Sequence, residues 1–358
     1  MKDYIYTSLH IQQFRSYADF AVDLSPGVNI VVGPNGCGKT NLLEAILIVS
    51  GFPSFRAHSS ELLQHEREWA RIDVGFKDGE RILKLEKRNE GIDKTYEING
   101  SRKKRPGFND IIPTIIFEPE HMRLLTGSPE HRRDFFDQML AETEANFSSL
   151  KNQYKRTLAQ RNSLLKQKNT IIKSQIFAWD VRLSELAGKL VASRQKLVTR
   201  LNEQLEAIYC EIAGKENKVA LQYDTKLPIA SYETSLLAKL EQNLQKDIER
   251  GFTTYGPHRD DFLVVLDNQP AEHIASRGET RTLVLSLKIL EIKIIEDARL
   301  QKPLILLDDV FSELDGSRRK ALTNYLKDYQ TIITTTDADV IVKEFAQKCN
   351  VISLTQTG

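Results

Sequence analysis

Apolar residues in the first part of the chain follow both strand-like and helix-like spacings. Residues 4–11 alternate between apolar and polar side chains, which predicts an antiparallel or edge strand. Residues 28–32 form a short β-branched run that ends at Gly33, which is typical of a buried strand. Residues 41–50 carry a dense set of apolar side chains and predict a buried helix. The beginning of the chain is therefore expected to be mixed α/β structure.

Three further alternating runs follow, at 71–76, 81–87 and 94–98. Asp-Gly and Glu-Gly pairs lie between them, and such pairs favour tight turns between neighbouring strands. The pattern predicts a meander of strands that forms an antiparallel β subdomain at about 70–100.

From about residue 130 to residue 214 the apolar spacing is helical. It predicts two long helices with a break near 169–174, and a further helix is expected at 231–249. Heptads are not sustained over many turns, so a long coiled coil is not expected.

The α/β pattern returns from about residue 251. It includes an apolar helix predicted at 282–295 and buried strands predicted at 304–307 and 331–335. The domains expected from these changes are an α/β lobe of residues 1–140 and 251–358, and an inserted helical lobe of residues 141–250.

Composition is that of an ordinary globular protein and does little to restrict its function. Of 358 residues, 41% are hydrophobic and 28% charged, and the formal net charge is +1. The three cysteines form no CxxC pattern or Cys/His cluster, so neither a zinc site nor a disulfide framework is expected. No signal-peptide pattern opens the chain and no apolar run approaches the ~20 residues of a membrane span, which predicts a cytoplasmic protein without membrane association.

The strongest chemical signal is the stretch GPNGCGKT at residues 33–40. It follows a predicted strand and opens a predicted helix, as the phosphate-binding motif GxxxxGK[ST] requires. Its glycines allow backbone N–H groups to surround phosphates at the helix N-terminus. Lys39 is expected to bind the β- and γ-phosphates of ATP, and the Thr40 hydroxyl to bind Mg²⁺. The predicted ATP-binding residues of this segment are Gly33, Pro34, Asn35, Gly36, Cys37, Gly38, Lys39, Thr40 and Asn41.

A second signal lies at the end of the strand predicted at 304–307. Four apolar residues precede Asp308 and Asp309, so a buried strand would deliver Asp308 to the metal ion. Asp309 is the predicted catalytic residue, which would orient or deprotonate the attacking water. A strand that ends in an acidic turn is common, but together with the phosphate-binding motif it indicates nucleotide hydrolysis.

The sequence Ser276-Arg277-Gly278-Glu279 begins 32 residues before Asp308. In isolation it would be interpreted as a helix N-cap with an acidic first turn. Its place between the other two motifs, however, resembles the signature S-x-G-[QE] of ABC-type ATPases. In that class the signature binds the γ-phosphate held by a second subunit. The resemblance therefore implies that Ser276, Gly278 and Glu279 complete the site of a partner in an ATP-dependent homodimer.

Two further segments are similar to parts of the same class. Residues 311–315 resemble the D-loop, which joins the two active sites of such a dimer, and its predicted residues are Ser312 and Asp315. The strand predicted at 331–335 occupies the place of the switch strand. Transporter members carry a histidine after that strand, and its absence here predicts slow hydrolysis.

Within the ABC class, several blocks resemble the RecF family of DNA replication and repair proteins. Phe14-Arg15-Ser16-Tyr17, before the first nucleotide strand, is typical of the DNA-repair branch, and Arg15 joins the predicted ATP-binding residues on that resemblance. The signature differs from the family's usual one, which has glutamine where Arg277 stands. The other similar blocks are residues 54–56, 117–120, 127–137, 256–261 and 306–315.

This resemblance implies both a fold and a function. The fold is an α/β ABC-type ATPase head (a P-loop NTPase) with an antiparallel β subdomain and an inserted helical lobe. The function is that of an ATP-dependent recombination mediator that binds DNA at single-strand gaps or junctions, dimerises with ATP, and is a weak, DNA-stimulated ATPase. RecF-like proteins work with RecO and RecR to load RecA, so these proteins are the implied partners.

Charge distribution supports a DNA partner independently of the resemblance. Residues 151–200 contain 12 Lys/Arg and 2 Asp/Glu, and a second basic cluster lies at 102–105. Such local excess suits phosphate binding with counterion release, although solvated basic helix faces are also common. No aromatic pattern interleaves these residues, so sequence-specific base reading is not indicated. The candidate DNA-binding residues are Lys151, Lys155, Arg156, Arg161, Lys166, Lys168, Arg102, Lys103, Lys104 and Arg105.

Two other functions remain open at this point. A transporter-type ATPase subunit would carry the switch histidine and a shorter gap than the 236 positions between Thr40 and Ser276. A chromosome-organising ATPase head would carry long heptad arms. His258, within the block 256–261, is compatible with either a nucleotide contact or a structural turn.

Overall fold

The computed structural model describes residues 4–55, 61–89, 91–167, 173–337, 341–342, 345 and 349–355 of the chain. The chain forms two compact units. The first unit is Met1–His121 with Glu291–Gly358, and the second is Met122–Leu290.

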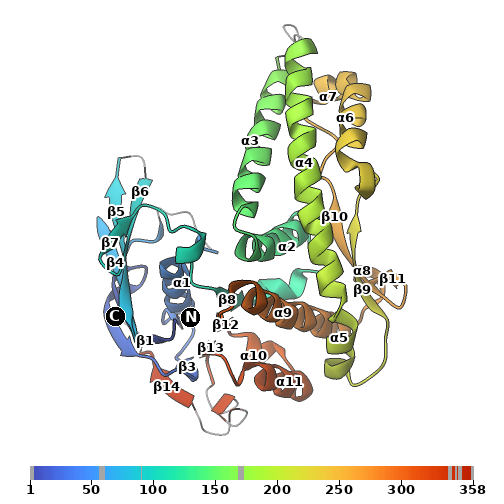
Figure 1. The fold of residues 1–358 in the computed structure, drawn as a ribbon. Coiled ribbons are helices and arrows are strands. Elements are labelled where there is room, and N and C mark those ends of the chain that lie inside the picture. The colour runs from blue at the N-terminus through green and yellow to red at the C-terminus, as the bar shows by residue number, and fades with distance from the viewer. Residues whose placement is uncertain are drawn as a thin grey trace. The chain divides into compact units, whose positions relative to one another are not determined.

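The first unit contains a five-stranded parallel sheet in the order β14-β3-β13-β12-β8 (Figure 1). Four of its strands are almost wholly buried, as expected for continuous apolar runs in a parallel sheet. Six residues separate β3 from the helix α1 (Lys39–Ser50), which packs against β12 and β13. The strands are β3 (Val28–Val32), β8 (Thr114–Phe117), β12 (Leu304–Asp308), β13 (Thr331–Thr335) and β14 (Cys349–Ser353).

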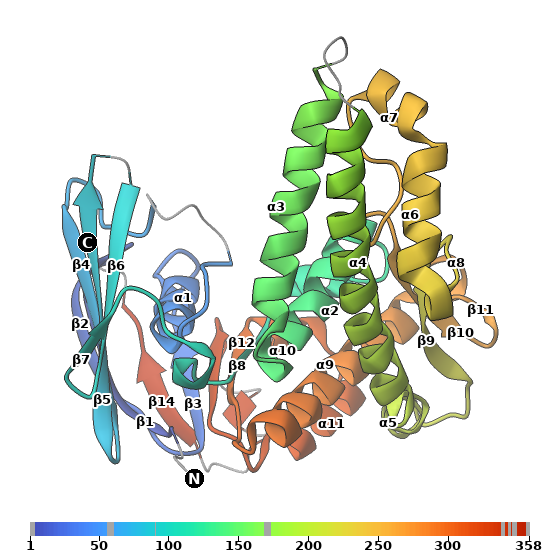
Figure 2. The ribbon, with the colours of Figure 1, turned by 45° about the horizontal axis from the view of Figure 1, so that its top comes forward.

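A six-stranded antiparallel sheet, in the order β2-β1-β4-β5-β6-β7, also belongs to the first unit. The other side of α1 packs on β4 and β5, so this helix lies between the two sheets in one apolar core (Figure 2). The sheet extends beyond the predicted span of about 70–100, because the alternating N-terminal segment pairs with β4. Its strands are β1 (Tyr6–Phe14), β2 (Tyr17–Asp23), β4 (Trp69–Phe76), β5 (Gly79–Arg88), β6 (Gly91–Ile98) and β7 (Ser101–Lys103).

Short helices complete the first unit, and one long helix passes from one unit to the other along the chain. No helix in the described part of the chain is long and apolar enough to cross a membrane. The elements are the 3₁₀ helices η2 (Phe108–Asp110) and η3 (Pro119–Arg123), α10 (Val310–Glu313), α11 (Gly316–Leu326), and the connecting helix α9 (Arg277–Arg299).

The second unit combines long helices with a three-stranded antiparallel sheet in the order β11-β10-β9. The helix α4 packs along α3 and α6 and also contacts β9. The helices are α2 (Pro129–Thr143), α3 (Phe147–Leu165), α4 (Lys173–Asn202), α5 (Leu205–Ala213), the 3₁₀ helix η4 (Ile229–Ser231), α6 (Tyr232–Gln242), α7 (Leu244–Arg250) and α8 (Ala271–Ile274). The strands are β9 (Val219–Asp224), β10 (Asp261–Leu266) and β11 (Gln269–Pro270).

The second unit is larger than the helical lobe of 141–250 expected from sequence. It also takes in α2 and β10, which pack on each other and were expected in the α/β lobe. The helix predicted at 231–249 is two helices, since Asn243 leaves the helical conformation between them and its side-chain amide donates to the Lys239 carbonyl. The predicted break at 169–174 falls mostly outside the described residues; α3 ends at Leu165 and α4 begins at Lys173.

Candidate nucleotide site and basic surface

The predicted phosphate-binding segment forms the loop between β3 and α1. Gly36 and Gly38 have φ angles of 84° and 99°, which favour glycine, and Gly38 is the N-cap of α1. The loop therefore presents the N-terminal N–H groups of a 12-residue helix, which attract anions. The Lys39 ammonium donates to the carbonyls of Gly33 at 2.7 Å and Pro34 at 2.9 Å, so its charge is held at the loop.

The turn that links β1 to β2 supports this loop from one side. The Tyr17 hydroxyl donates to the Gly38 carbonyl at 3.0 Å, and the Asn41 amide donates to the Ser16 hydroxyl at 3.0 Å. A Cβ atom at Gly38 would lie 2.7 Å from that hydroxyl, so the close approach requires glycine. Sequence reasoning gave Ser16 and Tyr17 no role, although their block was part of the family resemblance.

Arg15, a predicted ATP-binding residue, is held in an ion pair. Its guanidinium donates two hydrogen bonds to the buried Glu44 carboxylate, at 2.9 and 3.1 Å. Ser54 donates a short hydrogen bond to the same carboxylate. The side chain of Arg15 is thus directed to the second turn of α1 and not to a phosphate-loop residue. Arg56, from the same block as Ser54, lies outside the described residues.

Asp308 lies at the carboxyl end of β12, where three elements meet. The Thr40 hydroxyl donates to its Oδ1 atom at 3.0 Å, although the two residues are 268 positions apart. The Thr334 hydroxyl, at the end of β13, donates to the same oxygen at 2.8 Å. The structure therefore brings the two predicted metal-binding residues together. The sequence analysis gave Thr334 no role. Its contact with Asp308 could have been expected if the strands at 304–307 and 331–335 had been predicted to be neighbours, because the carboxyl ends of adjacent parallel strands lie at the same edge of a sheet.

Asp309 occupies a specialised position next to Asp308. Its φ angle of 52° lies in the left-handed region, and its N–H donates to the Thr334 hydroxyl at 3.1 Å. Its Oδ1 atom is buried and has no hydrogen-bond partner among the described residues. Burial raises the pKa of Asp309, while Ser312 and the Lys39 charge act in the opposite direction. A buried carboxylate oxygen without a partner is costly unless a further donor approaches it.

The predicted D-loop residues both form local hydrogen bonds in the first unit. The Ser312 hydroxyl donates to the Asp309 carbonyl at 2.6 Å, which connects this loop to the acidic pair. Asp315 is the N-cap of α11 and accepts from the Arg318 N–H at 3.1 Å. Both side chains are exposed.

The predicted signature residues belong to the second unit and begin α9. Ser276 and Glu279 form a reciprocal cap: the serine N–H and hydroxyl each donate to the Glu279 carboxylate at 2.9 Å. Glu279 is also paired with Lys215 at 2.6 Å, and these hydrogen bonds lower its pKa to about 2. Ser276 is exposed, so its hydroxyl lies at the surface of a helix N-terminus.

Arg161 requires a correction to the predicted DNA-binding set. Its side chain is fully buried and pairs with Asp180 and Asp247, at 2.5 and 2.8 Å. A further hydrogen bond joins it to the Thr253 hydroxyl. The run of basic residues at 151–200 suggested that Arg161 belongs to a basic surface. In the structure Arg161 lies on the buried face of α3, so it cannot contact DNA in this fold.

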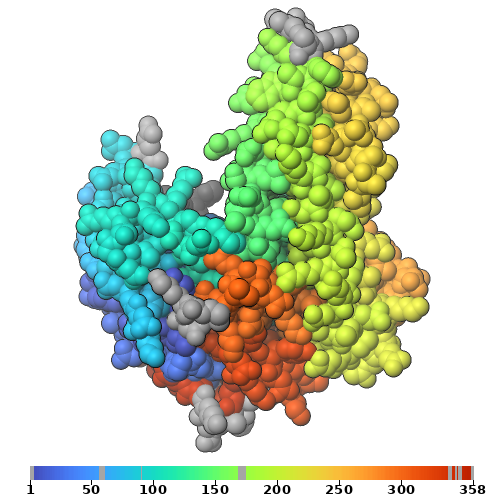
Figure 3. Space-filling model, viewed as in Figure 1, coloured from blue at the N-terminus to red at the C-terminus, as the bar shows by residue number. Residues whose placement is uncertain are grey.

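The remaining candidate DNA-binding residues differ in whether a carboxylate already pairs with them. Lys151 is already paired with Asp134 and Asp137, at 3.1 and 2.9 Å. Lys103 is bound to Asp110 at 2.8 Å. Arg102 lies 3.8 Å from Glu97. Lys168 lies outside the described residues. The exposed candidates without a carboxylate partner within the described residues are Lys155, Arg156, Lys166, Lys104 and Arg105. Figure 3 shows the outer surface of α3 (green) and α4 (yellow-green) in a space-filling view.

Two of the blocks similar to the RecF family bind each other inside the second unit. Arg132 of α2 forms a bidentate pair with Asp261, with distances of 2.6 and 2.9 Å. Arg133 donates to the Asp260 carbonyl at 2.8 Å. His258 is fixed by Tyr154, whose hydroxyl lies 2.6 Å from its Nδ1 atom. The structure thus favours the interpretation of the block 256–261 as a structural turn.

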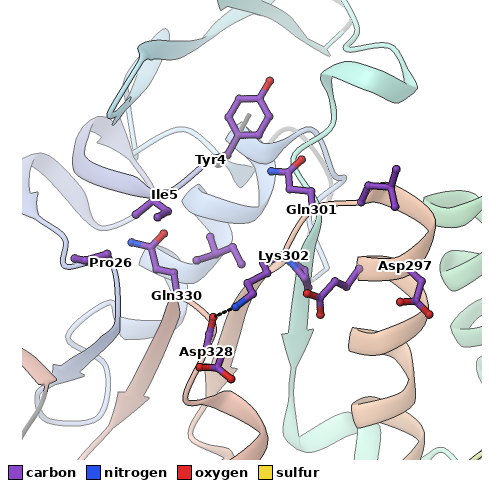
Figure 4. A pocket seen from close by; sticks show the side chains of 12 residues that line it. Tyr4, Ile5, Pro26, Asp297, Gln301, Lys302, Asp328 and Gln330 are labelled. Atoms are coloured by element: carbon purple, nitrogen blue, oxygen red, sulfur yellow. Dashed lines mark hydrogen bonds between the residues drawn. The ribbon is translucent and has the colours of Figure 1, made fainter. Parts of the chain in front are cut away.

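A hollow of about 560 Å³ lies at the opposite, amino-terminal edge of the parallel sheet (Figure 4). Its lining includes Tyr4, Pro26 and Gln330, and the Lys302 ammonium donates to the Asp328 carbonyl at 2.9 Å. It contains none of the residues of the phosphate loop or the acidic pair. Asp308 and its partner Thr40 lie instead at the carboxyl edge of the same sheet.

The chain is similar to known proteins over nearly its whole length. The model of the RecF/RecN/SMC N-terminal domain matches residues 5–357. The DNA replication and repair protein RecF of Heliobacterium modesticaldum is 34% identical, over 92% of this chain and 91% of that protein. The RecF protein of Clostridium acetobutylicum is 32% identical, over 97% of each chain.

Solved structures agree with this relationship. Two structures of the recombination mediator protein RecF in the RecFOR pathway, RecF-ATPrS and RecF-ATP, give TM-scores of 0.85 and 0.84 at 28% identity. They cover 94% of this chain, and 94% and 93% of their own. An Smc head domain from Pyrococcus furiosus gives a TM-score of 0.53 at 16% identity, covering 98% of this chain and 94% of its own, which is a likeness of fold alone. The fold is that of an ABC-type ATPase head, and the chain belongs to the RecF family of DNA replication and repair proteins.

Proposed function

We propose that this chain is an ATP-dependent, DNA-binding recombination mediator that uses ATP to control its own dimerisation. The observation that carries the proposal is the contact between Thr40 and Asp308 at the end of the phosphate loop, in a chain of the RecF family. The phosphate loop and the acidic end of β12, which lie far apart in sequence, meet there in one site. This site has the groups that bind a nucleoside triphosphate and its metal ion.

ATP would be held by the loop of residues 33–40. Its N–H groups and the N-terminus of α1 favour the phosphates, and the Lys39 ammonium adds a charge. Lys39 would exchange its two loop carbonyls for phosphate oxygens. RecF structures named for ATP, at 28% identity, support this assignment.

Mg²⁺ would be held by Thr40 and Asp308. Their hydroxyl and carboxylate oxygens are hard ligands, and Mg²⁺ in such sites takes one or two protein oxygens together with substrate phosphates. No group of three or more His, Cys, Asp or Glu among the described residues forms a metal site of its own, which agrees with a shared site of this kind. When bound, the ion supplies positive charge that stabilises the triphosphate. Thr334 would hold Asp308 in position.

Asp309 would be the general base of hydrolysis. Its buried Oδ1 atom has no partner among the described residues, and burial raises its pKa, both of which favour an oxygen that accepts a proton from water. The residues after β13 include no histidine, so we propose that turnover is slow and that DNA stimulates it.

ATP would join two copies of the chain. Ser276, at the exposed N-terminus of α9, would bind the γ-phosphate held by the partner's phosphate loop, with Gly278 and Glu279 beside it. The exposed Ser312 and Asp315 would contact the partner close to the same site. An interface of this kind is isologous, because each copy donates one phosphate loop and one signature.

DNA would be bound by the free cations of α3 and its C-cap, namely Lys155, Arg156 and Lys166, with Lys104 and Arg105 as a second contact. Binding would be independent of base sequence and directed to single-stranded or gapped DNA. By family membership the protein partners would be RecO and RecR, which together load RecA, in the cytoplasm.

The experiment that tests this function is DNA binding measured over a salt series, with ATP, with ADP and without nucleotide. We expect ATP to strengthen binding, and log K to fall linearly with log salt at about 0.7 to 0.9 per phosphate contact. Reversal of Lys155, Arg156 and Lys166 to Glu should flatten that line and leave ATP binding unchanged. Equal DNA affinity in the three nucleotide states would contradict ATP control.

A further inference from the structure

A cavity of about 370 Å³ lies within the second unit, and its lining includes no residue assigned to ATP. Its size falls within the roughly 300–1,000 Å³ range typical of small-ligand pockets. Cations from three separate elements line it: Arg133 of α2, Lys155 of α3 and Arg259 of the segment before β10. The first and last of these come from the two RecF-like blocks that bind each other.

The positive charge of this cavity is not neutralised internally. Two other cations in its wall, Lys151 and Arg194, are both bound to Asp137, at 2.9 Å in each case. By contrast, no carboxylate within the described part of the chain pairs with Arg133, Lys155 or Arg259. Glu130 is the one lining carboxylate among the described residues that is not bound to a cation. Three free cations thus face one free carboxylate.

The existing contacts of these cations leave donors available. Arg133 uses one N–H for the Asp260 carbonyl, and four N–H groups of its guanidinium remain. Arg259 lies over the Phe252 ring, 5.1 Å from its centroid, which orients the side chain without neutralising it. Lys155 is exposed. A planar arginine fork next to a second arginine and a lysine matches the oxygens of a phosphate group.

His258, which also lines the cavity, adds no compensating negative charge. His258 Nε2 lies 3.2 Å from the Thr253 carbonyl, which only accepts, so this nitrogen carries the proton. In the neutral ring, Nδ1 then accepts from the Tyr154 hydroxyl at 2.6 Å. Burial, with Arg259 and Arg133 among the nearby charges, lowers the pKa of His258 to about 4.

We propose that this cavity binds a phosphate group carried by a nucleotide, with Arg133, Lys155 and Arg259 as its ligands. The inference rests on the DNA-binding part of the proposed function and adds a defined subsite to it. Arg133 and Arg259 lie outside the run of basic residues at 151–200 and become nucleic-acid contacts only through the fold. The phosphate is either part of a DNA strand or part of a free nucleotide, and the two sources are separable.

The test uses the full chain with Lys155→Gln and Arg259→Gln together, since both side chains are exposed and neither makes a protein hydrogen bond within the described residues. The matched control is Lys196→Gln with Lys226→Gln, which removes two exposed cations of the same unit that do not line the cavity. Arg133→Gln is a third variant. Thermal unfolding verifies that each protein is folded.

Three probes are titrated: oligothymidylate with a 5′-hydroxyl, the same strand with a 5′-phosphate, and thymidine monophosphate against thymidine. The nucleotide titration is done in chains that also carry Lys39→Ala, so that the phosphate loop does not contribute. We expect the double variant to bind the strands roughly tenfold more weakly at 0.15 M salt and to lower the salt slope by about 1.4, at about 0.7 per single-strand contact. The control should stay within twofold of the wild type.

The probe that loses affinity identifies the source of the phosphate. A loss on both strands indicates a backbone phosphate, a loss confined to the 5′-phosphorylated strand a chain end, and a loss of thymidine monophosphate alone a free nucleotide. Unchanged binding of all three probes, or an equal loss in the control, would overturn the cavity as a phosphate site. If the wild type binds neither strand at any salt concentration, the DNA part of the proposed function fails, while the monophosphate titration still tests the cavity.

Discussion

Arg161 and Asp247 form an ion pair at 2.8 Å in which both side chains are completely buried, although the residues lie 86 positions apart. The pair joins α3 to α7, and the same guanidinium also binds Asp180 of α4. The side chain of Arg161 therefore connects three helices of the second unit, α3, α4 and α7. The charge of Arg161 is neutralised by buried carboxylates inside the protein and is not presented at the surface.

We predict that Arg161→Gln destabilises the protein. The change leaves two carboxylates buried without their cation, and breaking a buried pair on one side typically costs about 3–5 kcal/mol. Urea unfolding measures the loss, with Arg156→Gln on the exposed face of the same helix as the control. A free energy of unfolding equal to that of the control would show that the buried pair is not a structural requirement.

Thr334→Val should impair ATP hydrolysis more than ATP binding. Valine keeps the shape of the side chain but removes the hydroxyl that holds Asp308 Oδ1 and accepts from the Asp309 N–H. We expect a higher Mg²⁺ concentration for half-maximal hydrolysis, and restoration of the wild-type value by Thr334→Ser. A valine variant with the wild-type Mg²⁺ dependence would remove Thr334 from the site.

Lys39→Ala and Asp309→Asn should separate nucleotide binding from hydrolysis. The first removes the ammonium held at the phosphate loop and should abolish ATP binding in a calorimetric titration. The second should bind ATP normally and hydrolyse it slowly, which would trap the dimer. Hydrolysis at the wild-type rate by Asp309→Asn would mean that another group activates the water.

Ser276→Arg should leave ATP binding by the single chain intact and block dimerisation. The new side chain adds bulk and charge at the exposed N-terminus of α9, where the partner's γ-phosphate is proposed to bind. Sedimentation with ATP, with ADP and without nucleotide measures the outcome. Mixed with Lys39→Ala chains, this variant should recover one composite site per heterodimer. A dimer of equal strength in all three nucleotide states would argue against a shared site.

The protein should lose stability in acid partly through His258. The folded chain holds the pKa of this ring at about 4, below the ordinary value of 6.5. Between these pH values the unfolded chain binds a proton that the folded chain does not, so stability falls as the pH falls through this window. Urea unfolding at pH 7 and pH 4.5 should show a smaller loss for His258→Gln. Identical losses in the two proteins would mean that the ring is already protonated in the fold.

The sequence by itself predicted the local structure of the candidate nucleotide site. The strands at 28–32 and 331–335 were predicted with the bounds that the structure has, because apolar β-branched runs flanked by turn residues have few other stable conformations. The phosphate loop followed from its glycines, its lysine and the helix after it. The pairing of Thr40 with Asp308 was also accessible, since both residues follow buried strands of one parallel sheet.

Tertiary structure alone decided which charges are used inside the protein. Arg161 and Lys155 lie on the same predicted helix, but one is buried between two aspartates and the other is exposed. A pattern of charges along a helix does not specify the partners that other segments bring to it. The carboxylates that hold Arg161 come from other helices, and the cavity that gathers Arg133 and Arg259 exists only once α2 packs on β10. Local structure depends on neighbours in the chain, whereas charge pairing depends on neighbours in space.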